Sequence, residues 1–225
     1  MRAPRVPVVL VTGFEPFGGD LTNPSWEIAR RLEGWEPPVA AVVQAVLLPC
    51  VFHDAIDILN RAITRLRPVA VIGLGLAASR NDISVERIAI NVDDARIPDN
   101  AGRQPIDQPV APGAPAAYWS TLPIKSIVAA LQEAGIPASV SQSAGTFVCN
   151  HVFFGLAHRL AKRRRVAASP GTGAGRPAIR GGFIHVPWPV GGALDLDTMV
   201  EAIRIAIRVT LTAQADQQLP GGALD

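Results

Sequence analysis

The segment SQSAGTFVCNHVFFGLAHRL places Cys149 in the first turn of an expected amphipathic helix. The first amides of a helix have no intrahelical partner, and the positive end of the helix dipole stabilises a thiolate. The same amides can stabilise a developing oxyanion. A buried, inert thiol would also fit this position. From its placement alone, Cys149 is therefore equally compatible with a nucleophile and with a packing residue.

A thiol nucleophile needs a neighbouring base, and the chain has four histidines. His151 follows Cys149 by two residues, so its side chain points to another side of the helix, and His158 lies about 13 Å along the axis. His185 ends the apolar run GGFIH, near the carboxyl end of an expected strand, where α/β folds gather ligand groups. His185 is the favoured base, whereas His53, at an expected helix start, stays an open alternative.

An imidazole base is oriented by an acid or an amide. Glu86 is the candidate, because it lies within the apolar alternation of ISVERIAI, where an ordinary surface carboxylate is not required. A salt bridge to Arg80 or Arg87 is the alternative explanation for Glu86. Ser143 is a rival nucleophile, but SQSAG lacks the first glycine of the G-x-S-x-G elbow.

Two glycine-framed stretches have the spacing of nucleotide-binding loops without their essential groups. In residues 13–20 (GFEPFGGD), Gly and Asp occupy the positions where a phosphate loop needs Lys and a hydroxyl residue. Residues 73–78 (GLGLAA) fit the dinucleotide pattern, but the following residues alternate like a strand instead of starting a helix. The histidines include no H-E-x-x-H pair. Neither a cofactor nor a metal is expected.

The elements that position these residues follow from apolar periodicity, which predicts an α/β domain with a mainly parallel sheet. Strands are expected at 7–12, 39–48, 69–74, 139–141 and 182–186, and helices at 24–33, 52–67, 124–134, 147–164 and 196–211. Residues 83–92 have a strand period and are expected to form a strand or a hairpin broken near Glu86. Residues 98–117 form a long loop, residues 166–180 a flexible insertion, and residues 214–225 a disordered tail after a single domain at 1–213.

Composition narrows the class of protein. The chain has 225 residues, of which 48% are hydrophobic and 18% charged, and its net charge of +2 gives no reason to expect a nucleic-acid partner. The basic run at 162–165 closes a helix, where cations complement the dipole. No apolar stretch reaches the roughly 18 residues of a membrane span. Two cysteines make no disulfide framework, so a cytoplasmic protein is expected.

Four separated blocks together resemble the pyroglutamyl peptidase I family, also called pyrrolidone carboxyl peptidases. The blocks are TGFEPFGG with NPS, VERIAINVDDARIPDNAGRQP, SAGTFVCNHVFF and GFIHVPWP, and they cover most of the chain in the order of the family. The resemblance implies a cysteine exopeptidase that removes an N-terminal pyroglutamyl residue from peptides. It also implies a twisted central sheet flanked by helices on both faces, and a cytoplasmic homotetramer.

The resemblance assigns the nucleophile to Cys149, the base to His185 and the acid to Glu86. It places the pocket for the lactam ring at Phe14 and Phe17, whose faces can sandwich a flat, neutral ring. A charged, open-chain glutamate would be desolvated there without a partner. Further contacts are implied at five positions: Asn23, Leu76, Phe147, Val148 and Arg96.

Two features depart from the family pattern. Leu76 occupies a position where many members have Gln, so we expect the backbone at this position, and not the side chain, to hold the lactam. The stretch 166–180 is longer than usual. Two other functions stay open: a nucleoside-phosphorylase-like enzyme, for which no phosphate or ribose contacts can be placed, and a non-catalytic lactam-binding protein.

Overall fold

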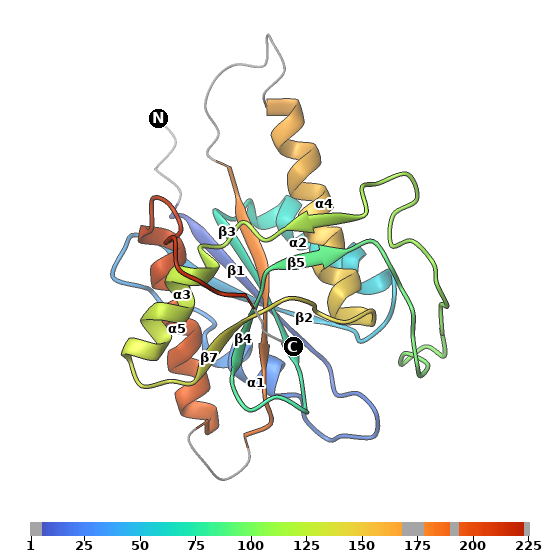
Figure 1. Cartoon of the computed structure of the whole chain (residues 1–225), viewed down its shortest axis with the longest axis horizontal. Coiled ribbons are helices and arrows are strands. Elements are labelled where there is room, and N and C mark those ends of the chain that lie inside the picture. The colour runs from blue at the N-terminus through green and yellow to red at the C-terminus, as the bar shows by residue number, and fades with distance from the viewer. Residues whose placement is uncertain (1–5, 168–177, 190–193, 223–225) are drawn as a thin grey trace.

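A six-stranded sheet with the order β2-β1-β3-β8-β4-β7 forms the centre of the computed structural model, which describes residues 6–167, 178–189 and 194–222 (Figure 1). Strands β1, β2, β3 and β8 are parallel, whereas β4 and β7 are parallel to each other and antiparallel to β8. The predicted α/β fold with a mainly parallel sheet is confirmed. The strand bounds are β1 Val8–Phe14, β2 Val42–Leu48, β3 Ala70–Leu76, β4 Ile83–Glu86, β7 Ala138–Ser141 and β8 Arg180–Val186.

Helices cover both faces of the sheet (Figure 1). Helices α1, α3 and α5 pack together on one face, and α2 and α4 pack together on the other. None of the helices in the described ranges is long and apolar enough to cross a membrane. The bounds are α1 Pro24–Arg31, α2 Asp54–Leu66, α3 Ile124–Glu133, α4 Val148–Ala167 and α5 Leu196–Thr212, close to those expected from the sequence.

The predicted hairpin at 83–92 is wrong in its pairing, although the break after Glu86 is present. Strand β4 ends at Glu86 and belongs to the central sheet, whereas β5 (Ile88–Ile90) pairs with β6 (Ala117–Trp119) in a separate two-stranded sheet. The side chain of Asn150, on α4, holds β5 through hydrogen bonds of 3.0 Å from the Ile90 N–H and 2.9 Å to the Ile90 carbonyl. Asn150 and Ile90 lie 60 residues apart, so the local periodicity of the sequence cannot predict this contact.

The long loop at 98–117 is fastened to the body at several points. Gln108 forms an isolated bridge with Asp93, and the Asn91 side chain bonds both the N–H and the carbonyl of Ala111. Residues 214–222, which the sequence suggested to be disordered, follow a defined path across α3 and β7. Of the expected insertion at 166–180, residues 168–177 lie outside the described part of the chain.

Candidate active site

Cys149 and His185 lie on the same face of the sheet above adjacent strands. His185 on β8 is the register partner of Gly75 on β3, and directly opposed residues of parallel strands present their side chains to the same face. A Cβ atom added to Gly75 would lie 2.8 Å from Sγ of Cys149, so the thiol occupies the space over this glycine. Cys149 reaches that position because α4 begins at Val148, as the sequence predicted.

A carboxylate holds the imidazole of His185. Nδ1 of His185 lies 2.7 Å from Oε1 of Glu86, and the two residues are only 4% and 0% exposed. An ionised carboxylate can only accept, so Nδ1–H is the donor. This tautomer leaves Nε2 of His185 as the nitrogen that can exchange a proton.

Glu86 also has the salt bridge that the sequence offered as an alternative. Nη1 of Arg80 donates to the same Oε1 atom at 2.7 Å, and Nη2 donates to the carbonyl of Ser143 at 3.0 Å. Ser143 belongs to the loop that leads into α4, so Arg80 joins the acid to the segment that carries Cys149. The two explanations for Glu86 are therefore both present, and Arg80 is a site residue whose importance sequence reasoning underestimated.

The charge of Glu86 follows from these contacts. Burial opposes ionisation, but the hydrogen bond from His185, the charge of the protonated imidazole and the contact with Arg80 outweigh it. The pKa of Glu86 is therefore held below its ordinary value. Glu86 is therefore a carboxylate at neutral pH.

Cys149 is half-buried, and burial raises the pKa of its thiol. The nearby Cys50 and Glu86 act in the same direction, whereas the charge of Arg80 opposes them. Desolvation thus outweighs the stabilisation that the start of α4 offers to a thiolate. The resting thiol is neutral at pH 7, so a nucleophilic sulfur requires proton transfer to a base. Burial also raises the pKa of Cys50, to about 12.

The two phenylalanines of residues 13–20, called the opening loop below, have different environments. Phe14 is 2% exposed and packs in the core, with its ring centroid 6.4 Å from that of Phe183. Phe17 is half-buried and packs against Phe147, with centroids 5.2 Å apart at an angle of 49°. Another ring cannot fit between Phe17 and Phe147, which already touch. Phe52 meets Phe147 edge-on, with ring centroids 5.3 Å apart, and so extends this aromatic cluster.

Asn23 connects the opening loop to α1. Its Oδ1 accepts from the N–H of Ser25 at 3.1 Å and from the Ser25 hydroxyl at 2.8 Å, which caps the helix. Its Nδ2 donates to the carbonyl of Glu15 at 3.0 Å. These bonds give Asn23 a positioning role in the loop that carries Phe14 and Phe17.

The remaining predicted residues differ in exposure. Val148 is fully buried beside Cys149, and Leu76 is half-buried at the end of β3, next to Gly75. Arg96 is exposed and forms no ion pair or hydrogen bond within the described residues. Arg96 and the two residues after it are exposed, and none of the contacts of the site holds the Arg96 side chain.

The other histidines have partners of their own. His151 is fully buried; its Nδ1 lies 2.7 Å from Asp93, and its Nε2 accepts the N–H of His53 at 2.9 Å. Both ring nitrogens are thus engaged away from the thiol. His158 pairs with the Tyr118 hydroxyl at 2.9 Å. Sequence reasoning missed the histidine–carboxylate pair of His151, because its two members lie 58 residues apart.

A thiol over the carboxyl end of β3, an imidazole near the carboxyl end of β8 and a carboxylate on the neighbouring antiparallel strand β4 are the groups of a cysteine-type hydrolase. No group of three or more potential metal ligands of the His, Cys, Asp or Glu type occurs among the residues that the structure describes. The sequence model of the pyroglutamyl peptidase family matches residues 7–213, and the chain belongs to this family.

Relatives and solved structures agree with this assignment. The chain is 53% identical over 224 residues to the pyrrolidone-carboxylate peptidase of Chromobacterium violaceum, covering 96% of this chain and 98% of the relative. The pyroglutamyl peptidase I structure from Bacillus amyloliquefaciens has a TM-score of 0.85 at 40% identity, with 96% and 100% of the two chains covered. A pyrrolidone carboxyl peptidase variant from Pyrococcus furiosus has a TM-score of 0.82 at 41% identity, with 92% and 99% covered. The comparisons therefore favour a peptidase over the nucleoside-phosphorylase alternative.

Proposed function

We propose that the chain hydrolyses the bond after an N-terminal pyroglutamyl residue of a peptide, with Cys149 as nucleophile, His185 as base and Glu86 as orienting acid. The observation that carries this proposal is the 2.7 Å contact between Glu86 and His185, on the sheet face where the Cys149 thiol lies over Gly75. Membership of the pyroglutamyl peptidase family supports the substrate class.

The reaction begins when the Cys149 sulfur attacks the pyroglutamyl carbonyl carbon and its proton passes to Nε2 of His185. The carbonyl oxygen gains the displaced electron pair, next to the first N–H groups of α4, which lack intrahelical partners. When the tetrahedral intermediate collapses, the C–N bond breaks and His185 returns the proton to the leaving amine. Water, deprotonated by His185, then attacks the thioester, the C–S bond breaks, and pyroglutamate and the free thiol are released.

The lactam ring packs against the half-buried pair of Phe17 and Phe147, whereas Phe14 supports the loop from the core, where it packs against Phe183. Apolar faces suit a neutral ring and disfavour the charged glutamate side chain. The backbone at Leu76 offers the polar contacts, since its apolar side chain cannot. Val148 closes the wall beside the nucleophile and Asn23 holds the loop, while the exposed Arg96 is a further candidate for contact with the peptide.

Release of a chromophore from a pyroglutamyl arylamide tests the proposal, with a prolyl arylamide as the control substrate. We expect Cys149→Ala and His185→Ala to abolish release from the pyroglutamyl compound, with circular dichroism confirming that both variants fold. Full activity in either folded variant would refute the assignment of that residue.

We further propose that the protein acts in the cytoplasm as a homotetramer. Both cysteines are free thiols, which suits a reducing compartment. Exposed apolar side chains such as Trp119 and Ile106, each 66% exposed, are candidates for contacts between subunits. Light scattering of the purified protein and fractionation of the source cells test the two statements; a monomer or a secreted enzyme would contradict them.

A further inference from the structure

The groups proposed to take part in the reaction lie one after another across the strands of the central sheet. Phe14 ends β1, the Cys149 thiol lies over β3, His185 is on β8 and Glu86 ends β4. The acyl side of the substrate, which is the lactam ring, therefore lies toward β1. His185 protonates the leaving amine, so the peptide beyond the scissile bond extends from the thiol toward β8, β4 and β7.

The sheet continues in that direction with a polar face. Ser84 is the register partner of both His185 and Ser139, and Glu86 is the partner of Ser141, so these side chains share the face that carries His185. Helices α2 and α4 pack over β1, β2, β3 and β8, whereas α3 packs on β4 and β7 from the opposite face.

A shallow pocket of about 470 Å³ occupies this polar part of the face. Its lining consists of six residues: Arg80, Asn81, Asp82, Ser84, Ser139 and Ser141. Arg80 joins the pocket to the proposed catalytic acid, because its guanidinium donates to Glu86 at 2.7 Å. Ser84, one of the lining residues, is the register partner of His185, so the pocket begins beside the proposed base.

The charges of the lining residues determine which side chain fits. The positive charge of Arg80 is matched by Glu86, and its second nitrogen is bonded to the Ser143 carbonyl. Asp82 is partly exposed, and its Oδ1 accepts only from the neutral hydroxyl of Ser84, at 2.7 Å. No cation within the described ranges forms a salt bridge with Asp82, so its negative charge is uncompensated.

We propose that this pocket is the subsite for the residue after pyroglutamate and that Asp82 makes it selective for basic side chains over acidic ones. The inference rests on the proposed function and adds the class of peptide that the site prefers. A lysine or arginine side chain reaches Asp82 with its charged end, while the serine hydroxyls contact its stem and backbone. A glutamate or aspartate at the same position meets the carboxylate of Asp82 and is repelled.

A competition assay tests the subsite. Pyroglutamyl-lysine amide and pyroglutamyl-glutamate amide are mixed in equal amounts with the full-length enzyme, and the disappearance of each is followed by mass spectrometry. The ratio of the two rates gives the ratio of kcat/KM values regardless of how much enzyme is active. We expect lysine to be favoured by about two- to fivefold at low salt, the range for partly exposed charge pairs, and less so at high salt.

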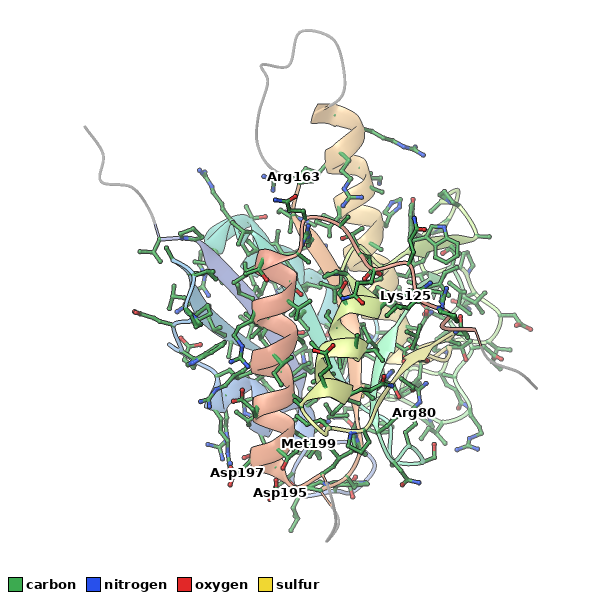
Figure 2. All side chains as sticks on the ribbon, turned by 60° about the vertical axis from the view of Figure 1, so that its left-hand side comes forward. Arg80, Lys125, Arg163, Asp195, Asp197 and Met199 are labelled. Atoms are coloured by element: carbon green, nitrogen blue, oxygen red, sulfur yellow. The ribbon has the colours of Figure 1, made fainter. Side chains whose placement is uncertain are left out.

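Two variants of Asp82 and a matched control complete the design. Asp82→Asn keeps an acceptor for Ser84 and should bring the ratio close to one, whereas Asp82→Lys should invert it in favour of glutamate. The control is Asp197→Asn. Asp197 is an exposed carboxylate in the first turn of α5 that pairs with Arg31. Figure 2 shows Asp197 well separated from Arg80. The ratio for the control variant should equal that of the wild type.

The outcomes separate the subsite from the proposed function. Wild-type protein that cleaves neither the peptides nor a pyroglutamyl arylamide would overturn the proposed function and the subsite with it. Wild-type protein that cleaves both peptides equally, or Asp82 variants whose ratio matches the wild type, would overturn the subsite alone.

Discussion

Oε1 of Glu86 accepts hydrogen bonds from Nδ1 of His185 and from the guanidinium of Arg80, both at 2.7 Å. The two contacts have opposite effects on the proposed catalytic pair. The carboxylate favours the protonated imidazole that forms during attack, whereas the guanidinium partly neutralises the carboxylate and repels the imidazolium. Arg80 also opposes the other influences on Cys149 by favouring its thiolate. Arg80 therefore favours one of the two charged forms that the proposed attack generates, the thiolate, and disfavours the other, the imidazolium.

Substitution of Arg80 should change the pH dependence of catalysis. The positive charge of Arg80 favours the Cys149 thiolate, so its removal should raise the apparent pKa of the Cys149–His185 pair. We expect Arg80→Met to shift the acidic limb of the kcat/KM profile on a pyroglutamyl arylamide to higher pH, by up to about one unit. Arg80→Lys retains the charge and should restore most of the profile. Identical limbs in wild type and Arg80→Met would contradict this electrostatic role.

The lowered pKa of Glu86 also predicts how stability depends on pH. A carboxyl group whose folded-state pKa is lowered contributes stability above its unfolded pKa of about 4.3, and this contribution disappears as pH falls through the folded-state value. We expect Glu86→Gln to lose less stability than the wild type as pH falls below about 4.3. Urea unfolding of both proteins at a series of pH values from 7 to 3 measures this. Parallel losses in the two proteins would show that Glu86 is not responsible.

At the scale of secondary-structure elements, the site depends on the close approach of α4 to β3. Gly75 makes this approach workable, because a Cβ atom there would lie 2.8 Å from both the Cys149 sulfur and the Phe183 ring. Phe183 is fully buried and cannot yield easily. The G-x-G pattern at 73–75, which resembled part of a nucleotide loop, instead leaves room for a side chain from a neighbouring helix and for a core phenylalanine.

Gly75→Ala should therefore damage the site more than an ordinary strand substitution. We expect a stability loss of about 1–3 kcal/mol, typical of overpacking, and a lower kcat because the thiol is displaced. Gly222→Ala is the control, since no atom lies within 4 Å of a Cβ placed there. Unfolding curves and arylamide hydrolysis measure both effects. If Gly75→Ala kept the stability and the kcat of the wild type, the close approach of α4 to β3 would not depend on this glycine.

The extent to which sequence predicted these elements depends on the range of their interactions. Helix α1 was predictable because its start signals, Asn23 and Pro24, are adjacent and act locally. The pairings of β4 with β7 and of β5 with β6 were not predictable, because the paired strands lie far apart in the chain. The contacts of the site have the same limitation: Glu86 and His185 lie 99 residues apart, and their proximity came from family resemblance and strand placement, not from a local pattern.

At the scale of the whole molecule, the segment after α5 connects distant parts of the fold. Helix α3 has no side-chain cap of its own, and Asp216 supplies one by accepting from the Ser126 N–H at 2.8 Å. Further along, the carbonyl of Gly221 accepts hydrogen bonds from Arg87 and Gln142. Arg87 follows the proposed acid, and Gln142 lies at the start of the loop that leads to Cys149. The family model ends at residue 213, so this segment lies beyond the part that the model matches.

Removal of the segment should weaken both stability and catalysis. A chain ending at Ala213 loses the cap of α3 and the carbonyl that bridges Arg87 and Gln142, whereas Asp216→Ala loses only the cap. We expect Asp216→Ala to destabilise the protein by about 0.5–2 kcal/mol with little change in kcat. We expect the truncated chain to lose more stability and also to show a lower kcat on a pyroglutamyl arylamide, since the strand end and the loop beside the site are then held by fewer contacts. Asp216→Asn, which keeps an acceptor, is the control. Because kcat is measured well below the unfolding temperature of each variant, a truncated chain with wild-type kcat would show that the segment serves stability alone.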